Sequence, residues 1–269
     1  MQTTHRRLMT VILGVLLAGC AGMRTTAAPE PEVRQALAPT GKLRVALQQG
    51  NALNVTKDPV SGELKGLGFD LGKELARRIG VPFEPVMYPS IAALLESGRS
   101  GGWDVAHFGF SPERAKEFDF APVHLEVEFG YLVRSGSSIS TMADVDRPGV
   151  RVAVQEKSGP DVFFTRSLNN AAFIRAPSNP RALEALKSGS ADVMGSIKPI
   201  LFDMSKELPG SRVLDGRPGI DPHAIAMPKG RDRAMPYLRQ FMEEAKSRGL
   251  VKVAIDRADL RGVLVHQAN

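Results

Sequence analysis

Short apolar runs of the kind found in β-strands recur along the chain from residue 41 onward, and segments with helical spacing separate them. Capping residues mark the starts of several of these helices: Ser90 before 91, Ser111 before Pro112, and Asn179 before Pro180. Strands that alternate with helices predict an α/β fold with mostly parallel sheets. The expected strands are 43–47, 83–87, 105–109, 130–133, 151–155, 173–176, 192–196 and 223–227.

The globular part of the chain is long for a single domain. It spans about 225 residues from residue 41, whereas one domain has roughly 100 to 150. Two α/β lobes are therefore expected. We find no internal repeat in the sequence.

The N-terminal segment has the layout of a secretory signal. Arg6 and Arg7 precede an apolar run over 8–18, and small residues follow just before Cys20. The run is too short to cross a hydrocarbon core of about 30 Å as a helix, which takes about 20 residues. We expect residues 1–19 to be removed and the proline-containing stretch 20–40 to act as a tether.

Cysteine usage and charge narrow the classes of function. Cys20 is the only cysteine, so no disulfide is expected within the chain. Removal of residues 1–19 takes away Arg6 and Arg7, and the formal net charge falls from +6 to +4. Because no basic run of five residues is present, nucleic acid is not an expected partner. A mild positive charge weakly favours anionic ligands.

Several motifs resemble those of the family 3 extracellular solute-binding proteins, the polar-amino-acid type of ABC importer subunit. They are GELKGLGFDLGKELARRIGVPFEPVMY (62–88), WDVAHFGFSPERAKEFDFAPV (103–123), GYLVR (130–134) and, more weakly, RVAVQEKSG (151–159) and AIAMPKGRD (224–232). The resemblance implies a periplasmic binding protein type II fold, with two α/β lobes joined by a two-strand hinge. Lobe 1 would comprise 41–133 and 223–265, and lobe 2 would comprise 134–222. The string LAGC resembles a bacterial lipobox, which implies a lipid on Cys20 and a membrane-anchored periplasmic protein.

The candidate binding site lies at two junctions between a strand and a helix. The strand 105–109 runs into the capped start at Ser111, and the strand 151–155 runs into Ser158 and Gly159. In open α/β sheets the ligand crevice lies beyond the carboxyl ends of the strands, where helix N-termini favour anions. Two such junctions that face each other would hold a carboxylate from both lobes.

The resemblance assigns roles to residues at these junctions. It implies that the planar guanidinium of Arg114 pairs with the ligand carboxylate. Gly109 stands where many relatives carry a serine, so only its backbone would contact the ligand. Ser158 and Gly159 match the carboxylate contact of the second lobe, where relatives often have two hydroxyl residues.

The walls of the site depart from the family pattern. Tyr88 matches an aromatic residue that packs over the ligand, and the alternative is a rim tyrosine that fills the gap between strand and helix. A polar wall that includes Gln48, Asn51 and Asn54 replaces the aromatic residue that relatives often carry on the opposite side.

The second lobe lacks an acid that the resemblance leads one to expect. Ile197 occupies the position from which relatives supply a carboxylate to the ligand's ammonium group, between Ser196 and Lys198. Ser196 is a candidate ligand contact. Lys198 would favour a second acidic group on the ligand, and the alternative is an exposed lysine at a helix start before Pro199. Unless Glu126 or Glu128 replaces the missing acid, a small organic acid fits better than a free amino acid.

These features together predict a periplasmic solute-binding protein that captures a small anionic solute, either an organic acid or an amino-acid-like molecule, by hinge closure. Expected partners are ABC permease subunits, with membrane contact through the lipid alone and a monomeric state. A dehydratase-like enzyme that uses His107 and His124 and a ligand sensor module are the alternatives. We expect no cofactor and no catalytic residue, and the five scattered histidines do not indicate a metal site.

The Cys20→Ala variant tests the lipid anchor. We expect it to be released from membranes or to accumulate as an unprocessed precursor, because the acyl chains that hold the mature protein have no other attachment point. Fractionation followed by mass measurement of the N-terminus provides the readout. A mature, membrane-bound Cys20→Ala protein would rule the anchor out.

Overall fold

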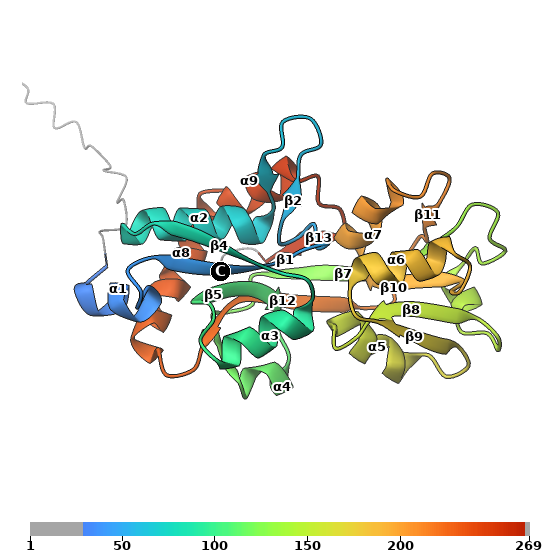
Figure 1. The fold of residues 1–269 in the computed structure, drawn as a ribbon, viewed down its shortest axis with the longest axis horizontal. Coiled ribbons are helices and arrows are strands. Elements are labelled where there is room, and N and C mark those ends of the chain that lie inside the picture. The colour runs from blue at the N-terminus through green and yellow to red at the C-terminus, as the bar shows by residue number, and fades with distance from the viewer. Residues whose placement is uncertain (1–28, 267–269) are drawn as a thin grey trace, which may run out of the picture.

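The computed structural model describes residues 29–266 (Figure 1). The predictions for the signal segment 1–19 and for Cys20 lie outside the described residues. The two halves of one mixed sheet extend to opposite sides of the molecule, and helices cover both faces of each half.

Three parallel strands form the centre of the first half. Strand β1 pairs on one side with β4 and on the other with β5, and α2 and α3 connect them. Strand β12 adds to β5 in the antiparallel direction. The bounds are β1 (Leu43–Gln48), α2 (Leu67–Ile79), β4 (Phe83–Tyr88), α3 (Ile91–Arg99), β5 (Val105–Gly109) and β12 (Ile220–Pro228).

The second half repeats this arrangement. Strand β8 pairs in parallel with β9 and β10, and β7 adds to β10 in the antiparallel direction. The bounds are β7 (Leu125–Val133), β8 (Arg151–Gln155), α5 (Gly159–Ser167), β9 (Ala172–Ala176), α6 (Asn179–Lys187), β10 (Val193–Ile197) and α7 (Lys198–Ser205).

Two long strands connect the halves. The start of β7 pairs with β12 through residues 125–128 and 220–223, and the rest of β7 pairs with β10 over 129–133. Figure 1 shows β7 and β12 side by side between the two halves. This arrangement fits the expected two-strand hinge. The exact lobe boundaries at 133/134 and 222/223 stay predictions.

The remaining elements complete the described part of the chain. They are α1 (Pro31–Leu37), β2 (Thr56–Lys57), β3 (Leu64–Lys65), α4 (Pro112–Ala115), β6 (Phe118–Phe120), η1 (Met142–Val145), β11 (Arg212–Val213), η2 (Asp232–Ala234), α8 (Met235–Ser247), α9 (Leu250–Arg257) and β13 (Val263–Val265). Among residues 29–266, no helix combines the length and the hydropathy that a membrane crossing requires.

The expected tether over residues 20–40 is wrong for its last ten residues. Pro31–Leu37 form the helix α1, and Leu37 and Ala38 are buried in the core. Proline stands at the first helical position, where its missing N–H has no cost and its fixed φ suits a helix. Any tether therefore ends before Pro31.

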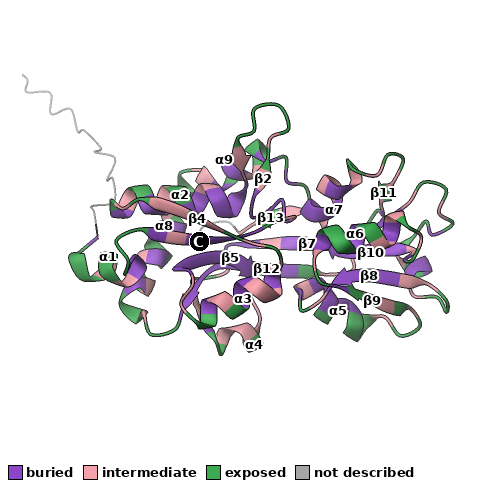
Figure 2. Ribbon diagram, viewed as in Figure 1, coloured by how far each residue is buried: buried purple, intermediate pink, exposed green. Residues whose placement is uncertain are grey.

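Alternating side chains of β1 face two separate apolar clusters. Val45 and Leu47 pack in the large cluster with α2, whereas Ala46 packs in the smaller one with α3 and Trp103. Successive side chains of a strand point to opposite faces of the sheet. Because helices cover both faces here, both sets of side chains are buried and the strand is almost wholly apolar. Figure 2 shows the resulting buried strands beneath helices with exposed outer sides.

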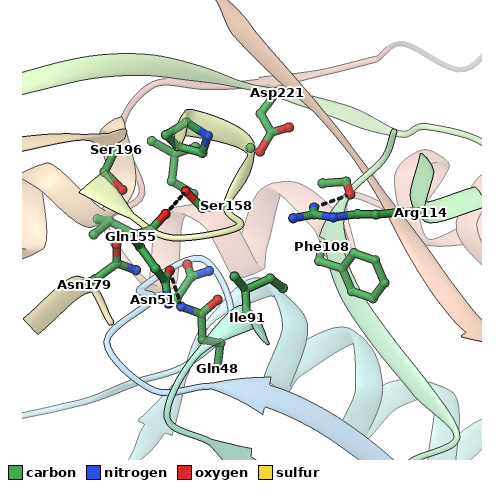
Figure 3. Close-up of a pocket in the computed structure, with 15 residues that line it drawn as sticks. Gln48, Asn51, Ile91, Phe108, Arg114, Gln155, Ser158, Asn179, Ser196 and Asp221 are labelled. Atoms are coloured by element: carbon green, nitrogen blue, oxygen red, sulfur yellow. Dashed lines mark hydrogen bonds between the residues drawn. The ribbon is translucent and has the colours of Figure 1, made fainter. Parts of the chain in front are cut away.

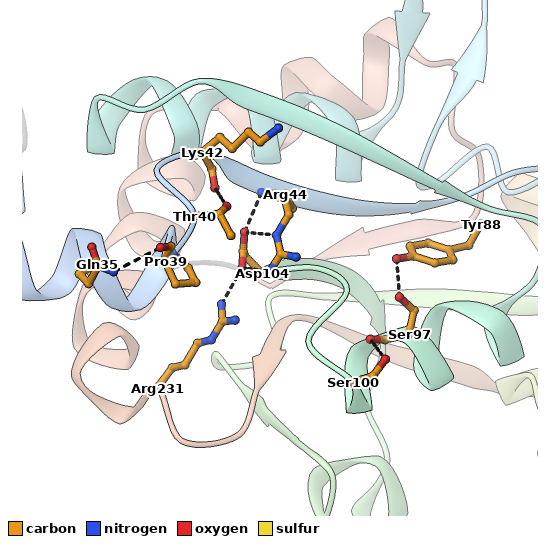
Figure 4. Close-up of polar contacts among 10 residues, drawn as sticks. All are labelled: Gln35, Pro39, Thr40, Lys42, Arg44, Tyr88, Ser97, Ser100, Asp104 and Arg231. Carbon is orange, nitrogen blue, oxygen red and sulfur yellow. Dashed lines mark hydrogen bonds and ion pairs between the residues drawn. The ribbon is translucent and has the colours of Figure 1, made fainter.

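In each half, an arginine–aspartate pair lies at the start of the central strands, opposite their carboxyl ends. The Asp104 carboxylate accepts from the backbone N of Arg44 at 2.9 Å, from its Nε at 3.0 Å and from its Nη2 at 2.7 Å (Figure 4). Asp192 accepts from the same atoms of Arg151 at 2.9, 2.9 and 2.7 Å. The two lobes therefore do repeat, and the repeat is visible in RVALQ (44–48) and RVAVQ (151–155).

We expect Asp104→Asn to lower the free energy of unfolding by about 3 to 5 kcal/mol, because it leaves two guanidinium groups without their buried counter-charge. Arg231 Nη1 lies 3.0 Å from Asp104, whose side chain is 0% exposed. The matched control is Asp203→Asn, which breaks an exposed pair with Lys206 and should cost less than about 1 kcal/mol. Equal urea midpoints for the two variants would contradict the structural role of Asp104.

Candidate functional site

A pocket lies where the carboxyl ends of strands from the two lobes face each other (Figure 3). Its empty space measures about 370 Å³, a figure that includes the part open to solvent. The first lobe contributes Gln48, Asn51, Ile91, Phe108, Gly109 and Arg114. The second contributes Gln155, Ser158, Gly159, Pro160, Asn179, Ser196, Ile197 and Ile200, and β12 contributes Asp221.

Six of the eight ligand-binding residues expected from the sequence line this pocket, namely Asn51, Gly109, Arg114, Ser158, Gly159 and Ser196. Ser111 and Tyr88 are not among the lining residues. The pocket thus lies at the two strand–helix junctions that the sequence indicated. The ligand contacts themselves stay predictions.

Arg114 extends across the gap between the lobes. Its Nη1 donates to the Gly109 carbonyl at 2.7 Å and its Nη2 to the Lys157 carbonyl of the second lobe at 3.1 Å. Its guanidinium lies 5.6 Å from the ring centroid of Phe108. Burial lowers the pKa of Arg114, and the charge of Asp221 opposes this shift. Nη1 and Nη2 each carry two N–H groups and use one of them, so this half-buried guanidinium retains N–H groups for a ligand.

Both serines at the helix starts use their hydroxyl groups as caps. Ser111 Oγ accepts from Arg114 N at 3.2 Å, which fixes the turn that carries the arginine. Ser158 Oγ accepts from Asp161 N at 3.2 Å and donates to the Gln155 carbonyl at 2.6 Å. The Ser158 hydroxyl proton is therefore already used. Ser111 acts by holding Arg114 in place.

Uncharged polar groups join the lobes across the pocket. Gln48 Nε2 donates to Gln155 Oε1 at 2.9 Å, and Asn179 Nδ2 donates to the Gly50 carbonyl at 3.3 Å. Asn179 is free for this contact because Ser178, and not Asn179 as expected, caps α6. A Cβ on Gly50 would lie 2.9 Å from Pro180 Cδ, so the lobes touch closely here. The structure is a closed form of the two lobes.

Asp221 places a carboxylate in the pocket between the two junctions. Its Oδ2 lies 3.1 Å from His223 Nε2, and its side chain is 11% exposed. A Cβ on Gly109 would lie 2.7 Å from both carboxylate oxygens, and a Cβ on Gly159 would lie 2.8 Å from Oδ2. Sequence reasoning missed Asp221. Its one signal was an acid at the start of the second crossing strand.

Comparison with known proteins places the chain in a family. The model of the bacterial extracellular solute-binding proteins, family 3, matches residues 43–257. The chain is a family 3 solute-binding protein. The ABC transporter glutamine-binding protein of Bacillus subtilis is 26% identical over 252 residues, which cover 90% of this chain and 91% of that protein.

Solved structures share the fold. An amino acid ABC transporter substrate-binding protein from Streptococcus pneumoniae, bound to L-arginine, has a TM-score of 0.74 at 25% identity and covers 83% of this chain and 97% of its own. An ancestral amino-acid-binding protein, a precursor of cyclohexadienyl dehydratase, has a TM-score of 0.72 at 24% identity, with 83% and 98% covered. The type II binding-protein fold inferred from the motifs is confirmed.

In this family 3 protein, neither glutamate of β7 that could replace the acid missing at Ile197 lines the pocket. Glu128 Oε2 lies 2.5 Å from Lys198 Nζ, and Glu126 Oε1 lies 3.2 Å from His266 Nε2. Lys198 does not line the pocket either, because its side chain turns to Glu128. The expectation that Lys198 attracts a second acidic group of the ligand is therefore wrong.

Tyr88 lies away from the pocket of this family 3 protein. Its hydroxyl oxygen is 2.6 Å from Ser97 Oγ on α3 (Figure 4). Its ring packs against the smaller apolar cluster between β4 and α3. The alternative interpretation, a rim tyrosine between strand and helix, describes it. Asn54 is likewise structural, since its Nδ2 donates to the His107 carbonyl at 2.8 Å.

Three buried histidines lie behind the pocket. His107 Nε2 is 3.1 Å from His124 Nε2, and the ring centroids of His107 and His223 are 5.2 Å apart. Burial, followed by the charge of neighbouring imidazoles, holds the pKa of His107 well below its usual value. Burial also lowers the pKa of His124 to about 3. Both imidazoles are therefore neutral at physiological pH.

Metal and catalytic chemistry find little support in the described residues. No group of three or more His, Cys, Asp or Glu side chains within 29–266 is arranged to hold a metal ion. Among residues 29–266, Arg114 and Asp221 are the only ionisable side chains that line the pocket. His107 and His124 do not line it.

We expect the free energy of unfolding to fall as the pH drops below about 6.5. The unfolded chain then protonates His107 and His124 while the folded chain does not, so each histidine costs up to about 1.4 kcal/mol per pH unit. Urea unfolding between pH 7.5 and pH 5 measures the slope. His124→Asn should flatten it, whereas the control His266→Asn should leave most of it. An unchanged slope in His124→Asn would show that this buried imidazole does not resist protonation.

Proposed function

We propose that this chain is the solute-binding component of an ABC importer and that it captures an amino-acid-like solute by closure of its two lobes. The observation that carries the proposal is the position of Arg114, which lies in the pocket with donors directed at both lobes. An arginine held at a strand–helix junction is suited to bidentate recognition of a carboxylate. The relatives named above, a glutamine-binding protein and an arginine-bound protein, support an amino-acid-like ligand.

Closure supplies the mechanism. The solute meets one lobe in an open form, and contacts from the other lobe favour the closed form that a permease recognises. The direct contact from Gln48 to Gln155 is a neutral hydrogen bond worth about 1 kcal/mol, and that from the charged Arg114 guanidinium to the Lys157 carbonyl is worth about 1.5 to 3 kcal/mol. Because these contacts are weak, the ligand provides most of the preference for the closed form.

The partners and the location belong to the same proposal. ABC permease subunits receive the solute, and the protein acts as a monomer in the periplasm, held to a membrane by the lipid on Cys20. The anionic solute expected from the sequence is replaced by a zwitterion, because the pocket holds the negative Asp221 as well as the positive Arg114.

Binding without catalysis fits the pocket better than the enzyme alternative. General acid–base catalysis needs a titratable group within hydrogen-bond reach of the substrate. The histidines considered for that role are buried behind the pocket, and the buried imidazole of His124 has a pKa of about 3. No observation favours the sensor alternative.

Arg114→Ala should weaken amino acid binding by about a hundredfold or more, because loss of one partner of a buried charge pair costs on the order of 3 to 5 kcal/mol. Arg114→Lys should lose part of the affinity, since it keeps the charge without the planar fork. Calorimetry with the twenty L-amino acids provides the dissociation constants. The control is Arg166→Ala, an exposed arginine of α5. An unchanged dissociation constant in folded Arg114→Ala would remove the carboxylate role from this residue.

A further inference from the structure

We propose that Asp221 determines specificity by receiving the positively charged group of a zwitterionic ligand. This inference rests on the proposed function, because it assigns a role within the same pocket. Asp221 lies on the crossing strand β12, not on the second-lobe strand that ends at Ile197.

The Asp221 carboxylate is held in place but not fully used. His223 Nε2 lies 3.1 Å from Oδ2 and is the hydrogen-bond partner of this carboxylate among the described residues. The Asp221 charge acts on the Arg114 guanidinium, but Nη1 and Nη2 of that guanidinium donate to the carbonyls of Gly109 and Lys157. Asp221 thus presents an acceptor oxygen to the pocket, and His223 is a positioning residue for it.

The backbone around the carboxylate leaves room for it from both lobes. A side chain on Gly109 would place Cβ 2.7 Å from both oxygens, and one on Gly159 would place Cβ within 3.0 Å of both. Real Cβ atoms almost never approach an atom below 3.0 Å. Glycine at these two positions therefore permits Asp221 to point between the lobes.

The charges in the pocket match the two ends of a zwitterion. Arg114 supplies the positive charge and Asp221 the negative charge, and no other charged side chain of the described part of the chain lies in the lining. A buried cation without a carboxylate partner is strongly disfavoured, so the ammonium group of a ligand must find its partner at Asp221. Glu126 and Glu128 pair with His266 and Lys198 outside the pocket.

An unpaired donor, Nε2 of Gln155, indicates a ligand that carries a hydrogen-bond acceptor as well as a positive group. Gln155 is 3% exposed and lines the pocket, and its Nε2 has no hydrogen-bond partner. A buried donor left unpaired costs about 1 to 3 kcal/mol, which a ligand carboxylate or carbonyl would relieve. The pocket therefore offers unpaired donors from Gln155 and Arg114 and an acceptor from Asp221.

The test begins with the wild-type chain. Thermal shift and calorimetry with the twenty L-amino acids identify the tightest ligand, which is then compared with the same molecule lacking its α-amino group. We expect the amino acid to bind at least fiftyfold more tightly than its deaminated analogue, because the analogue lacks one charged hydrogen-bonded pair. Equal binding of the two would overturn the role of Asp221 and leave solute capture intact. Absence of binding to either would overturn the proposed function as well.

The decisive variant is Asp221→Asn, which keeps the shape and removes the charge. We expect it to weaken binding of the amino acid about a hundredfold and to leave binding of the deaminated analogue unchanged or tighter. Asp221→Ser is a second neutral variant, in case the amide does not fold. The matched control is Glu126→Gln, which neutralises the acid paired in register with Pro222 on the neighbouring strand.

A rescue distinguishes a ligand contact from a structural role. Ile197→Asp in the Asp221→Asn background returns an acid to the pocket from β10, because Ile197 lines it. Recovery of at least tenfold in affinity for the amino acid, with none for the deaminated analogue, supports the proposal. Tighter binding of both ligands by Asp221→Asn would instead show that Asp221 occupies the site of the ligand's own carboxylate, and would overturn it.

Discussion

The pairing of β7 with β12 over residues 125–128 and 220–223 is the constraint on which the rest of the molecule depends. These strands are the paired connection between the two halves of the sheet, and each continues into a different half. Because the central strands of both halves end toward this connection, the helix starts at Ser111 and Ser158 face each other. The same pairing brings Asp221 to the pocket, with its partner His223 behind it.

The polar groups of the pocket divide into those that build it and those left for a ligand. The Ser158 hydroxyl in the lining and, outside it, the Ser111 and Tyr88 hydroxyls and the Asn54 amide all have protein partners. Among the described residues, part of the Arg114 guanidinium, Nε2 of Gln155 and one oxygen of Asp221 are groups of the lining that have no hydrogen-bond partner. A pocket with one charge of each sign discriminates by the separation of charges in the ligand, because a ligand with a single charge leaves one of these groups buried and unpaired.

Local signals in the sequence predicted the fold and much of the pocket. Capped helix starts that follow apolar strands place residues such as Arg114 and Gly159 at carboxyl ends of a sheet, and this placement depends on only a few neighbouring residues. The partners of Tyr88 and Lys198 could not be predicted in this way. Ser97 follows Tyr88 by nine residues and Glu128 precedes Lys198 by seventy, so competition for these side chains appears only in three dimensions.

Asp221 illustrates a second limit of sequence reasoning. It lies far along the chain from both Gly109 and Gly159, and neither glycine has a positive φ that would explain the choice of residue. The reason for each glycine is the space that a distant carboxylate occupies.

The prediction of a tether over 20–40 was wrong in its last part for a simpler reason. Prolines that are typical of linkers also begin helices, and burial of Leu37 decided between the two.

The contact from Gln48 to Gln155 resembles the centre of an isologous dimer interface within a single chain. Each glutamine follows the arginine of its lobe's arginine–aspartate pair by four residues, Gln48 after Arg44 and Gln155 after Arg151. Equivalent positions of two similar halves therefore meet at an approximate two-fold axis. A residue on such an axis must pair with a copy of itself. Lysine, arginine, aspartate and glutamate cannot do so without repulsion, whereas a carboxamide carries a donor and an acceptor and can.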